Sequence, residues 1–170
     1  MDQRQQKAFS LVELITTLCL AGIILSFATT TLGFLIKHNR EQASRDALLA
    51  HLSKTRTLSI TTQRTHILCG SSDGETCDGQ WSENWLILTP HDNRIHQRYD
   101  AHQADSICWS GFSQYIQYTP NGTSPISNGR FALCREERAA WQLVINRQGR
   151  VRVADTTEQS TCCMTDHTNG

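Results

Sequence analysis

The sequence predicts an α+β fold in which one long N-terminal helix packs on a small antiparallel β-sheet body. Two observations carry this prediction. Residues 14–36 contain no charged residue, and a helical pattern continues without Gly or Pro from Phe34 to about Thr62. After residue 63 the chain breaks into short stretches of strand-forming residues, separated by turn signals such as Asn121-Gly122.

The N-terminal part divides into a short polar leader, residues 1–8, and an apolar run, residues 9–36, that we expect to span a membrane. The 23 uncharged residues 14–36 would extend about 34 Å as a helix, against a hydrocarbon core of roughly 30 Å. The run is too long for the core of a cleaved secretory signal, and no small-residue cleavage site follows it. Glu13 interrupts its apolar character, and a carboxylate in such a position indicates a function.

Residues 37–62 continue the helix in amphipathic form. Their apolar residues recur among charged ones at helical spacing, so that one narrow stripe can pack on the body. The absence of a sustained heptad argues against a coiled-coil stalk. The expected stripe consists of Ala43, Ala47, Leu48, Ala50 and Leu58.

The body, residues 63–170, reads as an antiparallel, hairpin-rich structure. The last two of its expected strands form the clearest hairpin, because only the Arg147-Gln148-Gly149 turn region separates them. The expected strands are residues 65–70, 84–90, 94–100, 114–120, 130–134, 140–147 and 149–155.

Composition bounds the possible functions. The 170 residues carry no net charge and only 38% apolar residues, which predicts a thin core and no global attraction to nucleic acid. No nucleophile elbow, phosphate-binding loop or zinc-protease motif is present, and the histidines are scattered. We therefore expect neither an enzyme nor a cofactor. Asp73, Glu75 and Asp78 suggest calcium, but a solvated acidic loop is favoured.

Seven cysteines favour disulfides in an oxidising compartment over a metal site, since no C-x-x-C pair occurs. One of them, Cys19, lies in the apolar run as a small apolar residue. A disulfide between Cys69 and Cys77 would close a turn-rich loop, and Cys108 with Cys134 is the natural second pair. The six candidates, Cys69, Cys77, Cys108, Cys134, Cys162 and Cys163, still allow fifteen pairings.

The segment Ala8-Phe9-Ser10-Leu11-Val12-Glu13-Leu14 resembles the type IV prepilin signal. The resemblance implies that prepilin peptidase cuts between Ala8 and Phe9 and that Phe9 is N-methylated, with Ala8 in place of the usual Gly. It implies that Glu13 pairs with the Phe9 amine of a neighbouring subunit during assembly, whereas a plain anchor would let Glu13 reach the headgroups. It further implies a bacterial inner-membrane protein with one span and a periplasmic body, which joins a filament.

The body is similar to the GspH/FimT branch of minor pilins and pseudopilins. The similarity rests on RTHILCGSSDGETC, on the strand NWLIL, where Asn84 replaces a usual Gly, and on NRQGRVRV. It implies a minor pilin of a type IV pilus that helps to initiate assembly near the tip, with other pilins as partners. The alternatives are an H-type minor pseudopilin of a type II secretion system and a membrane-anchored periplasmic binding module outside any filament.

The segment Gly149-Arg150-Val151-Arg152 resembles the hairpin by which DNA-uptake minor pilins of this branch contact DNA. Arg150 and Arg152 share one face of a strand, and Arg147 lies across the turn. Three guanidiniums there would bind phosphates of double-stranded DNA in a salt-dependent manner. The alternative is a solvated edge strand protected by its charges. The candidates for extending the patch are Arg130, Arg135 and Arg138.

Overall fold

A computed structural model describes residues 10–101, 107–135 and 138–155. The chain forms two compact units, residues 1–39 and residues 40–170, and each is described by itself. Helix α1 (Leu11–Thr62) contributes to both of them.

In the first unit, α1 exposes most of its large apolar side chains. Three hydroxyl groups bond within the helix, because Thr16, Thr17 and Ser26 each donate to the carbonyl three residues earlier, at 2.7–3.0 Å. Among the described residues no helical stretch is both long and apolar enough to cross a membrane, so the expected span over residues 9–36 is not confirmed. The exposed residues are Leu11, Val12, Leu14, Ile15, Leu18, Leu20, Ile23, Leu32, Phe34, Leu35 and Ile36.

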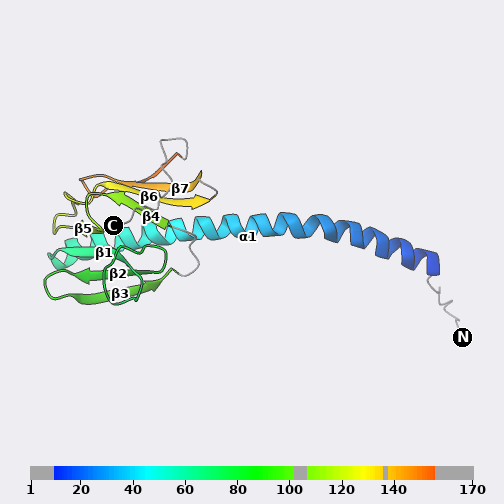
Figure 1. Cartoon of the computed structure of the whole chain (residues 1–170), viewed down its shortest axis with the longest axis horizontal. Coiled ribbons are helices and arrows are strands. Elements are labelled where there is room, and N and C mark those ends of the chain that lie inside the picture. The colour runs from blue at the N-terminus through cyan, green and yellow to red at the C-terminus, as the bar shows by residue number, and fades with distance from the viewer. Residues whose placement is uncertain (1–9, 102–106, 136–137, 156–170) are drawn as a thin grey trace, which may run out of the picture. The chain divides into compact units, whose positions relative to one another are not determined.

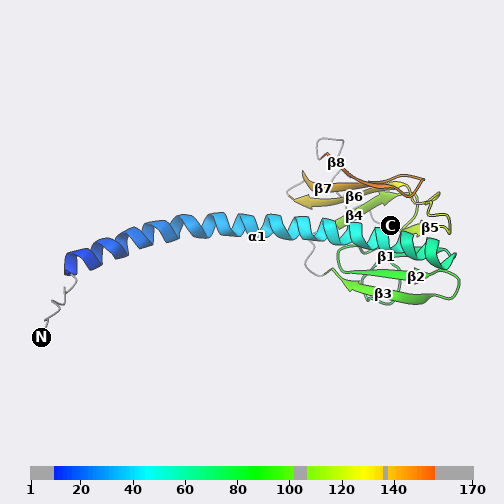
Figure 2. The ribbon, with the colours of Figure 1, turned by 180° about the vertical axis from the view of Figure 1, so that it is seen from behind.

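The second unit contains two four-stranded antiparallel sheets. The first sheet has the order β3-β2-β1-β5 and the second sheet the order β4-β6-β7-β8. Seen from opposite sides in Figures 1 and 2, the C-terminal part of α1 runs between β1–β3 and the strands of the second sheet. The strands are β1 (His66–Ser71), β2 (Asn84–Thr89), β3 (Arg94–Asp100), β4 (Ile107–Gly111), β5 (Tyr115–Tyr118), β6 (Gly129–Arg135), β7 (Arg138–Ile145) and β8 (Val151–Ala154).

The α+β class with a long N-terminal helix is confirmed, but the body has two sheets where one was expected. The strand that the sequence did not reveal is β4, whose segment ICWSG holds only two large apolar residues and ends in Ser and Gly. It is a strand because it pairs along its whole length with β6, from Ile107 opposite Leu133 to Gly111 opposite Gly129. Tertiary pairing thus overrides a weak local signal.

One apolar core fills the space between the helix and the two sheets. Leu48 and Leu52 of α1 are fully buried there. Trp85 and Ile87 come from the first sheet, and residues such as Leu143 come from the second. The core therefore joins all three layers, and residues 40–62 of the helix are part of the body.

The buried face of the helix matches the expected stripe in part, because Leu48 is in the core and Ala47 and Leu58 pack against it. Ala43 and Ala50 are exposed, whereas Thr55 and Ser59 are completely buried. Their hydroxyls remain satisfied because Thr55 donates to the His51 carbonyl at 2.7 Å and Ser59 donates to the Thr55 carbonyl at 3.0 Å. Bonding back to the helix lets short polar side chains take core positions.

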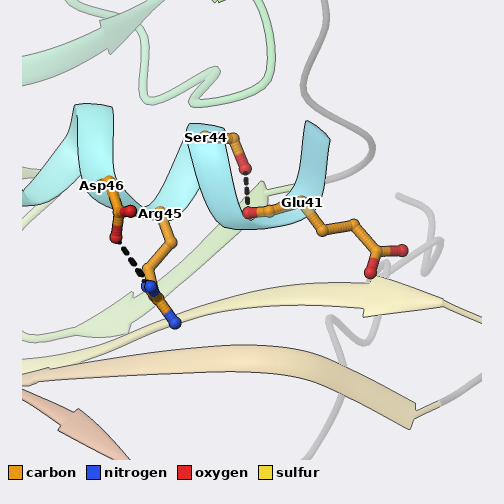
Figure 3. A network of polar contacts seen from close by, with 4 residues as sticks. All are labelled: Glu41, Ser44, Arg45 and Asp46. Atoms are coloured by element: carbon orange, nitrogen blue, oxygen red, sulfur yellow. Dashed lines mark hydrogen bonds and ion pairs between the residues drawn. The ribbon is translucent and has the colours of Figure 1, made fainter. Parts of the chain in front are cut away.

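The packed half of α1 begins with a set of polar contacts (Figure 3). Arg45 and Asp46 form an ion pair at 2.8 Å, and the Ser44 hydroxyl donates to the carbonyl of Glu41 at 2.9 Å. The Glu41 carboxylate points away from that pair, is almost fully buried, and lies 3.2 Å from the guanidinium of Arg135 on β6. This buried ion pair links the helix to the second sheet.

Candidate functional site

The turn between β7 and β8 is closed by its own backbone and by one amide side chain. The N–H of Gly149 donates to the carbonyl of Asn146 at 2.9 Å, and the N–H of Asn146 donates to the Arg150 carbonyl at 3.1 Å. The Asn146 side-chain oxygen accepts the Arg150 N–H at 2.9 Å. Gly149 has φ +72°, a conformation that favours glycine.

This turn rests directly on a second turn, between β5 and β6. A Cβ atom at Gly149 would lie 2.4 Å from the carbonyl oxygen of Gly122 and 3.0 Å from the Tyr118 ring. A Cβ at Gly122, which has φ +78°, would lie 2.8 Å from Cδ1 of Ile60 near the end of α1. The helix end and the two turns therefore stack with no side chain between the glycines, which fixes the position of the β7–β8 turn.

Arg147, Arg150 and Arg152 are exposed around this turn. The carbonyl of Arg147 accepts the N–H of Ser124 at 2.9 Å, so its backbone is also held. Because Val144 is in register with both Arg130 and Arg152, those two arginines share one face of the second sheet, two strand spacings or about 10 Å apart. Arg130 thus lies near the turn region.

Arg135 and Arg138 lie elsewhere. They pair with each other in register at the end of the β6–β7 hairpin that is opposite to the β7–β8 turn. The structure therefore separates these two arginines from the candidate site.

Arg56 is a further residue beside these two turns, and sequence reasoning missed it. The half-buried Arg56 lies on α1, with Nε 3.1 Å from where a Cβ of Gly122 would be. Burial raises the pKa of the neighbouring Tyr118 hydroxyl to about 12, which the positive charge of Arg56 partly opposes. An arginine on a helix gives no spacing signal, so only the fold reveals that it adds a guanidinium beside the turn.

Strand β8 is an edge of the second sheet and holds Arg152, whereas Arg150 precedes the strand, and an edge position is compatible with both interpretations of Arg152. Arg152 alternates with Val151 and Val153, of which Val153 is 51% exposed. Guanidiniums on such an edge can bind phosphate groups, and they also oppose edge-to-edge association.

The loop after β1 is closed by a disulfide between Cys69 and Cys77, whose Cα atoms are 5.6 Å apart. The backbone folds tightly there, since a Cβ at Gly70 would lie 2.6 Å from the carbonyl carbon of Gln80. Asn84 donates from its side chain to the carbonyls of Ser71 and Ser72 at 3.3 and 3.4 Å. This residue therefore ties the loop to β2.

The acidic residues of this loop are used as internal acceptors. Asp73 accepts the N–H groups of Thr76 and Glu75 at 2.8 and 2.7 Å, and these bonds hold the pKa of its carboxyl far below the usual range. Burial raises the pKa of Asp78, but hydrogen bonds from Ser72 and the Gln80 N–H outweigh it, and the net change is a decrease. Within the described ranges, no three His, Cys, Asp or Glu side chains are placed to hold a metal ion.

The remaining candidate residues lie in several parts of the chain. Ala8 and Phe9 lie outside the described residues, as do Cys162 and Cys163. Glu13 is exposed in the first turn of α1, and Cys19 is a free, exposed thiol. Cys108 and Cys134, on β4 and β6, are both disulfide-bonded.

A family model described as "Type II transport protein GspH" matches residues 44–149. Two crystal structures of the type IV minor pilin FimU from Pseudomonas aeruginosa (strain PAO1) share the fold. One has 20% identity and a TM-score of 0.57, covering 71% of this chain and 92% of that one. The other has 17% identity and a TM-score of 0.55, covering 69% and 94%. A search of curated proteins gives no match.

Proposed function

The chain belongs to the GspH family, and we propose from this premise that it is a minor pilin of a type IV pilus. Family membership makes it a minor pilin or pseudopilin, a structural protein and not an enzyme, that associates with other pilins or pseudopilins in a filament. The finer assignment to a pilus, to a place near its tip where assembly begins, and to DNA binding is our proposal.

Biogenesis would follow the prepilin route. Prepilin peptidase would cut between Ala8 and Phe9 and methylate Phe9, and residues 9–36 would hold the protein in the inner membrane with residues 63–170 in the periplasm. The exposed apolar surface of the first unit supports this, because a soluble monomer rarely leaves so many large apolar side chains in water. Glu13 would then pair with the Phe9 amine of a neighbouring subunit.

The observation that carries the DNA-binding proposal is the close packing of the β7–β8 turn on the β5–β6 turn, at Gly149 and Gly122. It holds the backbone of Arg147, Arg150 and Arg152 around one rigid turn, so that little backbone entropy remains to be lost on binding. Guanidiniums match phosphate oxygens in geometry, and each phosphate contact releases counterions. We therefore expect these three arginines to bind double-stranded DNA more tightly than an uncharged partner.

A gel shift with the full chain in detergent and a short DNA duplex tests this proposal. We expect Arg150→Ala/Arg152→Ala to weaken binding and to reduce the slope of log K against log salt by about 2. Arg94→Ala/Arg138→Ala is the matched control, because it removes the same charge from exposed positions on β3 and at the start of β7. If both double variants bind DNA as the parent does, the hairpin is not a DNA site.

The second candidate is the H-type minor pseudopilin of a type II secretion system, which the description of the matching family model favours. Sheared surface filaments that contain the protein would support the pilus. A secretion defect in a deletion strain with normal pili would support the pseudopilin. Absence of the protein from any filament, together with a Glu13→Ala variant that behaves normally, would favour a membrane-anchored periplasmic module.

A further inference from the structure

A cleft lies where the chain leaves α1 and passes beside the turn between β2 and β3. It has two adjoining parts, of about 490 and 210 Å³, whose walls share Arg64, Thr89 and Asp92. Pro120, which precedes the β5–β6 turn glycine by two residues, lines the larger part. Three separate segments of the chain therefore build this hollow, the β2–β3 cleft, and none of the β7–β8 turn arginines lines it.

Two arginines bring unpaired positive charge to the smaller part of the cleft. Arg64 and Arg94 are exposed, and neither guanidinium has a hydrogen bond or an ion pair with any residue in the described ranges. The carboxylate of Asp92 also lines the cleft, but it accepts the N–H of Arg94 at 3.2 Å and so closes the turn. Two guanidiniums thus stand against one carboxylate, and the cleft is positively charged.

Two histidines complete the wall of the smaller part. The ring centroids of His66 and His96 are 5.0 Å apart. Nδ1 of His66 lies 3.1 Å from the Arg64 carbonyl oxygen, and Nε2 of His96 lies 2.6 Å from the hydroxyl oxygen of Thr89. Because residues two apart on a strand share a face, His96 lies on the same face of β3 as Arg94. Both imidazoles are thus held in place beside the arginines.

The pKa of His96 reflects the electrostatic potential in the cleft. Burial lowers this pKa, and so do the positive charges of His66 and Arg94, whereas the negative charge of Asp92 raises it. The positive neighbours that disfavour a proton on His96 favour a negative group at the same place. This agrees with the arrangement of the charged side chains.

We propose that the β2–β3 cleft binds a tetrahedral oxyanion, the phosphate group of a small organic phosphate. Arg64 and Arg94 are its cationic ligands, and His96 is a donor whose contribution increases when its imidazole is protonated. Guanidiniums present paired N–H donors that match the geometry of phosphate oxygens. A hollow of this size admits one phosphate group and not the flank of a DNA duplex, so the inference does not depend on the DNA-binding proposal.

The larger part of the cleft favours an organic phosphate over the free ion. Its volume lies within the range of about 300–1,000 Å³ that is usual for small-molecule sites. Pro90, Pro120 and the imidazole of His91 line it, and proline rings carry no N–H donor. These surfaces can pack against the carbon skeleton of a molecule whose phosphate lies in the smaller part.

Isothermal titration calorimetry of the full chain in detergent tests the proposal, with glycerol 3-phosphate, inorganic phosphate and glycerol as probes. We expect glycerol 3-phosphate to bind more tightly than inorganic phosphate and glycerol not to bind. Equal binding of the two phosphates would support the oxyanion site and assign it to the free ion. Absence of binding by both phosphates, or equal binding of glycerol and glycerol 3-phosphate, would overturn the proposal.

A pair of variants separates the cleft from general charge. Arg64→Ala removes a charge-assisted ligand, so we expect it to weaken glycerol 3-phosphate binding at least about tenfold. Arg138→Ala is the matched control, because it removes the same charge from an exposed position at the start of β7, outside the cleft. Equal weakening by both variants, or no weakening by Arg64→Ala, would refute the assignment.

The role of His96 has its own readout, with inorganic sulfate as the probe because its charge is constant between pH 5 and 8. Sulfate should bind more tightly as the pH falls through this range, as the His96 imidazole gains a proton beside Arg64, Arg94, His66 and Asp92. By linkage, bound sulfate should raise the pKa of His96 in proton NMR spectra. His96→Gln should reduce the pH dependence, which separates His96 from His66. A His96 pKa that saturating sulfate leaves unchanged would overturn this role.

Discussion

The guanidinium of Arg135 lies 3.2 Å from the carboxylate of Glu41 and joins strand β6 to helix α1. The two partners differ in environment, since the Glu41 side chain is 3% exposed and that of Arg135 is 34% exposed. Among the described residues the Glu41 Oε1 atom has no hydrogen-bond partner, and its polar contact is the ion pair with Arg135. Loss of this ion pair would therefore be costly mainly because it would leave the buried Glu41 carboxylate without a counter-charge.

We expect Arg135→Ala to destabilise the body by roughly 1–3 kcal/mol, between the values for exposed and buried ion pairs. Glu41→Gln should cost less, because it removes the charge that needs a partner and nearly preserves the volume. The double variant should be more stable than Arg135→Ala alone. Urea unfolding followed by tryptophan fluorescence measures this, and an Arg135→Ala variant as stable as the parent would contradict it.

Gly149→Ala should destabilise the protein and weaken any DNA binding together. The new Cβ would lie 2.4 Å from the Gly122 carbonyl oxygen, in addition to the strain of φ +72°. Gly79→Ala is the matched control, since Gly79 has φ +83° but the nearest atom to its Cβ position, Cβ of Gln114, is 3.9 Å away. We expect the strain alone to cost about 1 kcal/mol and Gly149→Ala to cost more. Equal unfolding midpoints for the two variants would show that the turns do not press on each other.

Helix α1 and the hairpin patterns were predictable because their signals are local. A long uncharged run and turn signals such as Asn121-Gly122 act within a few residues. The same holds for the turn at Gly149, whose glycine is required by backbone conformation. Local chemistry thus predicted the elements that carry the candidate site.

Features that depend on distant residues were not predictable. Strand β4 exists through its pairing with β6, and Thr55 and Ser59 are buried because the two sheets enclose the helix. Arg56 lies near the arginines of the β7–β8 turn only because the two turns that contain Gly122 and Gly149 pack on the end of α1. In each case the deciding partner is far away in the sequence, and composition or spacing carries no trace of it.

His96 should titrate below the ordinary histidine range. Burial lowers its pKa, and so do the positive charges of His66, whose ring centroid is 5.0 Å away, and Arg94, while Asp92 acts in the opposite direction. Proton NMR of the imidazole signals measures this. We expect His66→Gln and Arg94→Gln each to raise the pKa of His96, because each removes a nearby positive charge. A His96 pKa that neither variant changes would refute the electrostatic explanation.

The stability of the Cys69–Cys77 loop should depend on pH through Asp73. Backbone N–H groups of Thr76 and Glu75 lower the pKa of this carboxyl in the folded protein. The unfolded chain therefore binds the proton at a higher pH than the folded chain does. The stabilisation is fully present above the unfolded value of about 4 and is lost as the pH falls towards the folded value.

Asp73→Asn should therefore lower the urea midpoint at pH 7, because an amide oxygen accepts the same N–H groups without a negative charge. The difference from the parent should shrink steadily as the pH falls below about 4, where the parent carboxylate itself begins to be neutralised. Asp92→Asn serves as the matched control, since Asp92 accepts a single backbone N–H, that of Arg94, at 3.2 Å. A destabilisation by Asp73→Asn that is equally large at pH 7 and at pH 3 would mean that the loop needs the shape of this side chain and not its charge.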